Sequence, residues 1–223
     1  MGILYYERGL DVHAMWRRVT QFFAILPIVN GVHMGEADRR ARPVVQIRVP
    51  LVRQATSYTC GVAALQSVLH YFGKSYRQDV LAEALRSDPE QGTNYKRMAA
   101  LAQGDGIACE AHEGMSPTLL RAMIDEGKPV IIALQAWGES GVDYAADWDD
   151  GHYVVVVGYD TAHFYFMDPS VMGNYTYLSL EALLVRWHDC YLEDGQLVRL
   201  HHFGLTFAGT TVAYDPAECV PMG

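Results

Sequence analysis

The sequence predicts an α+β fold. Between about residues 60 and 125, apolar residues recur mainly at helical spacing, whereas runs of β-branched and aromatic residues dominate from residue 130 onward. The strand-like runs are not part of a repeating strand–helix–strand unit, which argues against a parallel sheet with helices on both faces. The sequence has no internal repeat and no low-complexity segment, so we expect helices and strands to occupy separate parts of the fold.

The first expected helix begins at Cys60. The apolar residues that follow it at helical spacing are Val62, Leu65, Leu69 and Phe72. Gly73 ends the run, because glycine commonly follows the last turn of a helix.

Further helices and strands are expected on both sides of the chain's midpoint. Asp88–Pro89 should end one helix, and Ser116 followed by Pro117 is typical of a helix start. The expected elements are a helix over residues 76–86, a helix from a Thr93 cap to residue 104, a strand over 107–111, a helix from Ser116, a strand over 130–134 and a helix from Ser179 to about His188.

A β-hairpin is expected over residues 152–168. The run Val154–Val155–Val156–Val157 is typical of a buried strand, and a turn near residue 162 leads into a second, aromatic strand that ends at Asp168. Antiparallel strands joined by a tight turn bring the start of the first and the end of the second together. We therefore expect His152 and Asp168 to be neighbours, with the carboxylate fixing the tautomer of the ring.

The start of the first helix has the features of a nucleophilic site. Unpaired N–H groups and the helix dipole favour the thiolate form of a cysteine at this position. Gln54 lies six residues before Cys60, and its carboxamide could donate to a developing oxyanion. Each residue also has an ordinary structural interpretation. Cys60 could be a small core residue, His152 a polar residue at the start of a strand, and Asp168 a turn-forming residue before proline. Taken together, they favour a Cys–His–Asp triad.

These motifs resemble a known family. Gln-x₅-Cys-Gly-x₂-Ala-Leu, then Gly-His-Tyr-Val-Val-Val, then an aromatic strand into Asp-Pro, is similar to the papain-like cysteine peptidases that process bacteriocin precursors with double-glycine leaders, over about residues 47 to 190. The resemblance implies a helical half that carries the nucleophile, packed against an antiparallel β-sheet that carries the His and the Asp. It implies the roles of nucleophile, base, orienting acid and oxyanion donor for Cys60, His152, Asp168 and Gln54.

The expected function is hydrolysis of a peptide bond through an acyl-enzyme, with leader-peptide processing as the implied role. The same triad would also serve a papain-like acyltransferase, in which an amine or thiol replaces water. A non-catalytic module that binds peptides is the third alternative. The expected partner is a peptide or protein substrate, and no cofactor is expected.

The loop over residues 138–151 is rich in carboxylates. Its acidic residues are Glu139, Asp143, Asp147, Asp149 and Asp150. The loop is either an ordinary solvated surface or the rim of the cleft, where it would attract cationic substrates and raise the pKa of His152. In the second interpretation, Asp149, Asp150 and Gly151 are candidate substrate-binding residues.

Composition excludes several other classes of protein. The net charge of −9 over 223 residues argues against nucleic-acid binding, which needs a basic surface. The four cysteines form no Cys-x-x-Cys pair and the histidines lack zinc-site spacing, so no metal is expected. The sequence does not decide whether two of Cys109, Cys190 and Cys219 form a disulfide. No apolar run is long enough to cross a membrane, and composition leaves the oligomeric state open.

The first 45 residues are expected to form an extension of a peptidase domain over residues 46–223. Basic residues near Arg17 precede an apolar stretch, which is the order found in signal peptides, although no clear cleavage site follows. The alternatives are a helix packed on the domain or a pro-like segment, followed by a charged linker. We expect a cytoplasmic location, with export as the alternative if residues 15–35 act as a signal peptide.

Overall fold

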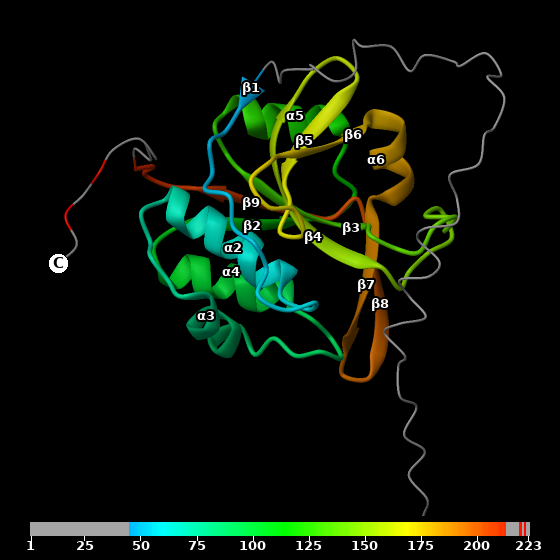
Figure 1. Ribbon diagram of the computed structural model, residues 1–223, viewed down its shortest axis with the longest axis horizontal. Coiled ribbons are helices and arrows are strands. Elements are labelled where there is room, and N and C mark those ends of the chain that lie inside the picture. The colour runs from blue at the N-terminus through cyan, green and yellow to red at the C-terminus, as the bar shows by residue number, and fades with distance from the viewer. Residues whose placement is uncertain (1–44, 213–218, 220, 222–223) are drawn as a thin grey trace, which may run out of the picture. The chain divides into compact units, whose positions relative to one another are not determined.

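The computed structural model describes residues 45–212, 219 and 221 (Figure 1). Its helices are α2 (Cys60–Tyr71), α3 (Gln78–Leu85), α4 (Tyr95–Gly104), α5 (Pro117–Asp125) and α6 (Leu180–Arg186). Its strands are β1 (Val45–Gln46), β2 (Ala108–His112), β3 (Val130–Gln135), β4 (Gly151–Tyr159), β5 (His163–Met167), β6 (Thr176–Ser179), β7 (His188–Glu193), β8 (Gln196–His201) and β9 (Gly204–Ala208).

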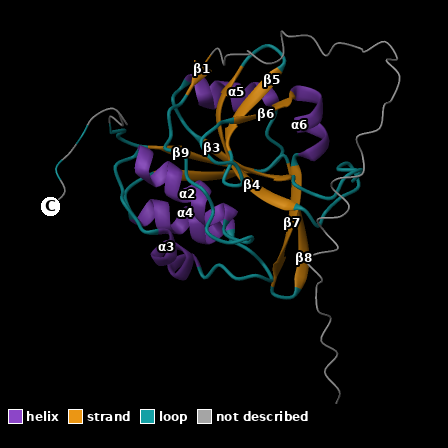
Figure 2. Ribbon diagram, viewed as in Figure 1, coloured by secondary structure: helices purple, strands orange, loops and turns teal. Residues whose placement is uncertain are grey.

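Seven of these strands form one antiparallel sheet. Its order is β2-β9-β3-β4-β5-β6, and β1 pairs with β4 near the far end of that strand. β7 and β8 form a separate two-stranded hairpin (Figure 2). The expected α+β class with an antiparallel sheet is therefore confirmed.

The helices cover different parts of the sheet. α2 packs against β4 and also contacts α3 and α4, so these three helices form one group beside the sheet (Figure 1). α5 packs against β1, β3 and β4, whereas α6 contacts β3, β5 and β6. This arrangement sets the start of α2 against the start of β4.

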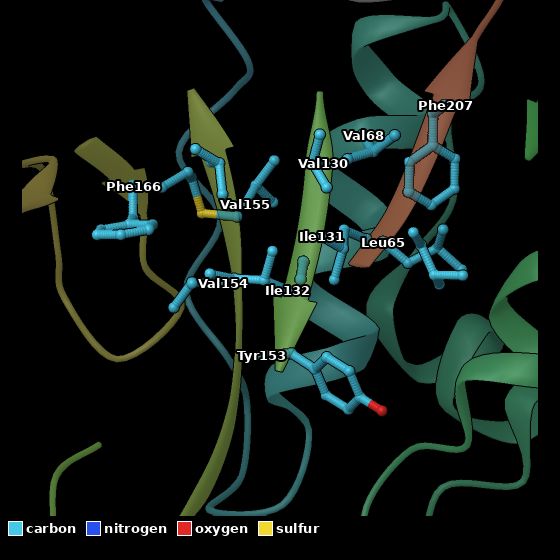
Figure 3. Close-up of a cluster of buried hydrophobic side chains, with 14 of the residues drawn as sticks. Leu65, Val68, Val130, Ile131, Ile132, Tyr153, Val154, Val155, Phe166 and Phe207 are labelled. Atoms are coloured by element: carbon cyan, nitrogen blue, oxygen red, sulfur yellow. The ribbon is translucent and has the colours of Figure 1, made fainter. Parts of the chain in front are cut away.

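The core lies between α2 and the centre of the sheet. Figure 3 shows Leu65 and Val68 of α2 facing the β3 and β4 side chains, with Phe207 of β9 beside them. Leu65, Val68 and Val155 are completely buried. Burial of an aliphatic side chain of this size contributes about 1.5–3 kcal/mol, so this contact fixes α2, and hence its first residue, on the sheet.

Several expected boundaries are confirmed and two are corrected. α2 begins at Cys60, and the Ser116 hydroxyl caps α5 by accepting from the Leu119 N–H at 3.1 Å. The cap of α4 is Asn94 rather than Thr93, because the Thr93 hydroxyl instead pairs with Ser87 at 2.9 Å. α6 ends at Arg186 and not near His188, since His188 already belongs to β7.

The expectations for the first 44 residues lie outside the described residues. In the described part of the chain, no helix has the length and apolar character needed to span a bilayer. All four cysteines are free thiols, so the disulfide left open by the sequence does not form.

Candidate active site

Cys60 is the first residue of α2 and is almost completely buried. The Thr59 carbonyl accepts the first helical hydrogen bond, from Ala63 N–H at 3.0 Å. The backbone N–H groups of the first turn therefore have no carbonyl partner within the helix. Cys60 thus presents both a thiol and a backbone donor at the same end of the helix.

His152 and Asp168 are brought together by the β4–β5 hairpin. Val155 pairs with Met167, so His152 near the start of β4 lies close to Asp168, which directly follows β5. His152 Nε2 and Asp168 Oδ1 are 2.8 Å apart, and each side chain is only 6% exposed. A contact this short between two buried groups fixes the orientation of the ring.

Two further hydrogen bonds hold the Asp168 carboxylate in place. Oδ1 also accepts from the Ser170 N–H at 2.8 Å, and Oδ2 accepts from the Thr176 hydroxyl at 3.4 Å. The carboxylate is therefore oriented by the turn after β5 and by β6.

The His152 ring also contacts Cys60, which gives it a raised pKa. Burial alone lowers the pKa of the ring, but hydrogen bonds to Asp168 and to the Cys60 thiol outweigh this and raise it to about 9. Because Asp168 engages Nε2, Nδ1 is the nitrogen left for the thiol. The main causes of the raised pKa are thus Asp168 and Cys60, and not the acidic loop that the sequence suggested.

Gln54 lies in the loop before α2 and is tied to the turn that follows Asp168. Its backbone N–H donates to the Pro169 carbonyl at 3.0 Å, and its Oε1 accepts from the Ser170 hydroxyl at 3.2 Å. Its Nε2 donates to the Thr56 carbonyl at 2.8 Å. Within the described residues this amide group has no other acceptor, which leaves one N–H for a ligand.

A cavity of about 390 Å³ opens beside Cys60. Asp149 and Gly151, two of the three predicted substrate-binding residues, line it. Asp150 does not line it. Its carboxylate lies against Gly138, where an added Cβ would be 2.0 Å from Asp150 Oδ2. Burial, and then the Asp147 carboxylate, raise the pKa of Asp150.

Sequence reasoning missed Asp189, which also lines this cavity. It lies on β7, a strand that the sequence did not predict. Burial raises the pKa of its carboxyl to about 7, against hydrogen bonds from Cys190 and Gln135 and the charge of His152, which lower it. No local motif marks Asp189, because its position depends on a hairpin that returns to the site from far along the chain.

A second, apolar cavity of about 510 Å³ is lined by Asp168 together with residues of β4–β6 and of the loop after β3. No three His, Cys, Asp or Glu side chains of the described ranges come close enough to hold a metal ion. The described groups near Cys60 are thus an acid–base pair, amide donors and carboxylates.

The sequence matches a model of the Peptidase_C39 like family over residues 46–191, well over half of the chain. The chain belongs to this family. It is therefore a cysteine peptidase, and its α+β fold is papain-like. A search of curated proteins finds no match.

Solved structures support the fold of this C39-like peptidase. A putative C39-like peptidase from Bacillus anthracis is 16% identical with a TM-score of 0.57, and the match covers 77% of this chain and 100% of that one. The peptidase domain of Streptococcus ComA, a bifunctional ABC transporter, is 22% identical with a TM-score of 0.54, with coverage of 73% and 100%. A double glycine motif protease from an AMS/PCAT transporter, in complex with its leader peptide, is 19% identical with a TM-score of 0.53, with coverage of 77% and 100%.

Proposed function

We propose that this peptidase hydrolyses a peptide bond with Cys60 as nucleophile, His152 as acid and base, Asp168 as the orienting carboxylate and Gln54 as an oxyanion donor. The observation that supports this most strongly is the His152 ring, which contacts the Cys60 thiol and the Asp168 carboxylate at once. We also propose that residues 46–223 form the catalytic domain and that residues 1–45 are an extension of it.

The ring donates and accepts protons in turn. A pKa of about 9 keeps it protonated at neutral pH, and the form of Cys60 that we propose as nucleophile is the thiolate. The sulfur attacks the carbonyl carbon, a C–S bond forms, and the carbonyl electron pair moves to oxygen. When the tetrahedral intermediate collapses, the C–N bond breaks and the imidazolium gives its proton to the leaving amine.

In the second half of the reaction, water takes the place of the leaving amine and hydrolyses the acyl-enzyme. Neutral His152 takes a proton from water, the oxygen attacks the thioester carbon, and the C–S bond breaks. The products are a carboxylic acid and the restored thiolate–imidazolium pair. Asp168 holds the ring in place throughout and does not take its proton.

The developing oxyanion needs donors close to the sulfur. We propose the Gln54 amide, which has one N–H without a protein acceptor, and the Cys60 backbone N–H at the start of α2 as these donors. One preorganised donor of this kind contributes about 2.7–4 kcal/mol to transition-state stabilisation. The link from Gln54 to Ser170 keeps the amide from rotating away.

The substrate that we propose is a precursor peptide with a leader segment. The double glycine motif protease with a TM-score of 0.53 was solved in complex with the leader peptide, which supports a peptide as ligand of this fold. Asp149 and Gly151 would contact the peptide directly, since both line the cavity next to Cys60. Asp150 would act by holding the loop against Gly138.

Mass spectrometry of a peptide library tests the proposal. Wild-type protein should generate new peptide termini, whereas Cys60→Ala should generate none and keep its circular dichroism spectrum. Cys219→Ala is the matched control, because that thiol is exposed and distant in sequence from the site, and it should cleave like wild type. Cleavage by Cys60→Ala would overturn the proposal, and products coupled to an added amine instead of water would indicate an acyltransferase.

A further inference from the structure

The cavity beside Cys60 carries negative charge that the proposed hydrolysis does not use. Three carboxylates line it, from Glu90, Asp149 and Asp189. No Lys, Arg or His is among the described residues that form its wall. His152 is not part of this wall: its ring pairs with Asp168 and contacts Cys60, although its charge also reaches Asp189 and lowers the pKa of that carboxyl. The wall is therefore net negative at the place where a substrate side chain would enter.

Asp189 is the carboxylate that the fold holds most firmly. Its Oδ1 accepts from the Cys190 N–H at 2.8 Å and from Gln135 Nε2 at 3.4 Å. Gln135 is itself completely buried, and its Nε2 also donates to the His188 carbonyl at 3.1 Å. Asp189 Oδ2 receives no hydrogen bond from the described residues. One oxygen is thus fixed by the protein, and the other is left for a ligand.

Gly151 places this carboxylate close to the catalytic strand. A Cβ at Gly151 would lie 2.5 Å from Asp189 Oδ1, so only glycine leaves room for the carboxylate beside β4. The next residue along β4 is His152. A side chain bound to Asp189 would therefore belong to a substrate residue near the bond that is cleaved.

The remaining wall suits the stem of a long side chain. Trp148, Tyr153 and Tyr191 line the cavity, and their rings can cover the methylene groups of a side chain. Two of these rings already have a cation of this chain over them, Arg199 at Trp148 and Lys96 at Tyr191, so the charged group of a ligand would have to be bound by a carboxylate. The volume of about 390 Å³ is within the range of sites that bind small ligands. A neutral side chain would leave the Asp189 carboxylate without a partner in a partly buried place, which is unfavourable.

We propose that this cavity binds a Lys or Arg side chain of the substrate, with the Asp189 carboxylate as its ion-pair partner and main determinant of specificity. This inference rests on the proposed function, because it takes Cys60 as the reacting residue. The predicted substrate-binding residue Asp149 adds negative charge at the exposed edge of the same cavity. In the free protein, burial raises the pKa of Asp189 to about 7, and a cation bound beside the carboxylate would lower it again.

Reactive tripeptide probes test this selectivity without knowledge of the natural sequence. Acyloxymethyl ketones are prepared in matched pairs, with Lys or the uncharged norleucine at the first, second or third residue from the reactive group and Ala elsewhere. Intact-mass spectrometry and peptide mapping give the rate of Cys60 modification. At one of the three positions, the Lys probe should react about tenfold faster or more, the size of effect expected for one hydrogen bond to a charged group.

The variants separate Asp189 from general negative charge. Asp189→Asn keeps the acceptor for the Cys190 N–H, and its Lys preference should fall to within about twofold. Asp194→Asn removes the same charge from the turn of the same hairpin, outside the cavity, and should keep the preference. Asparagine tolerates the positive φ of 51° at that position. On wild-type protein, a Glu probe should react more slowly than norleucine, which tests the proposal even if a variant is unstable.

The outcomes also distinguish this inference from the proposed hydrolysis. Equal rates for Lys, norleucine and Glu probes, or a Lys preference that survives Asp189→Asn, would overturn the cation site. Library cleavage together with that result would leave the peptidase mechanism intact. Conversely, a Lys preference that depends on Asp189, in a protein that cleaves no peptide, would support the cavity and count against hydrolysis.

Discussion

Gly61 and Thr93 lie so close together that a Cβ added to Gly61 would be 2.7 Å from the Thr93 Cβ. Tyr153 Cδ2 would be 3.0 Å from the same added atom. The residue after Cys60 must therefore be glycine if α2 is to approach β4 and the segment just before α4 this closely. This contact places the thiol against the start of β4.

Gly61→Ala should destabilise the protein by about 1–3 kcal/mol, because the start of α2 must move away from buried Thr93. The same shift should lower kcat by tenfold or more, since an error of about 1 Å at the sulfur is costly. Chemical denaturation and initial rates give both numbers. Gly104→Ala is the control, because Gly104 lies in α4 and its added Cβ would have nothing within 4 Å. This variant should keep the stability and the kcat of the wild type. Unchanged stability of Gly61→Ala would contradict the packing argument.

The cysteines should differ widely in their rate of alkylation. Burial raises the pKa of Cys109 to about 12, so its thiolate is scarce near neutral pH. Iodoacetamide at pH 7.5 should modify Cys60 at least about a hundredfold faster than Cys109, by peptide mapping. Exposed Cys219 serves as an internal reference. His152→Ala should slow modification of Cys60 but not of Cys219, and equal slowing of both would show that the ring does not activate the thiol.

The pH profile should report the His152–Asp168 pair. The ring must be protonated to donate to the leaving amine, so kcat/KM should fall as the pH rises through about 9, the raised pKa of His152. Asp168→Asn removes the carboxylate that raises this pKa, so the descending limb should move to lower pH by about one unit or more. If the descending limb of the Asp168→Asn profile stays at the wild-type pH, Asp168 does not set the protonation of the His152 ring.

Asp160→Asn provides the matched control for that profile. Asp160 contacts His163 at 3.2 Å at the opposite end of the same hairpin, so it forms a second His–Asp pair away from Cys60. Removing the Asp160 carboxylate with Asp160→Asn should leave the pH dependence of kcat/KM unchanged.

Local patterns predicted the parts of the fold that depend on neighbours in sequence. The valine run of β4, the Ser116 cap and the Gly73 stop each follow from backbone or side-chain preferences over a few residues. The proximity of His152 and Asp168 was predictable because a single hairpin joins them. The structure shows both side chains within hydrogen-bond distance.

The rest of the site depends on contacts between distant segments. β7 and β8 alternate polar and apolar residues weakly, and they pair with each other, whereas β9 joins the main sheet between β2 and β3. Asp189 reaches the cavity only through that arrangement. The Thr93 hydroxyl was expected to cap a helix, but Ser87 is a closer partner, which no spacing rule reveals.

Gln54 should affect kcat much more than KM. Its Nε2 is expected to stabilise charge that develops only in the transition state, so Gln54→Ala should lower kcat about 10²–10³-fold with little change in KM. Ser170→Ala removes the hydroxyl that holds Gln54 Oε1 and should cause a smaller loss of the same kind. Gln196→Ala, an exposed position on β8, controls for loss of a glutamine elsewhere. Steady-state kinetics separate the two constants. A rise in KM with kcat preserved would mean that Gln54 binds the substrate in its ground state, and the oxyanion would then depend on the Cys60 N–H alone.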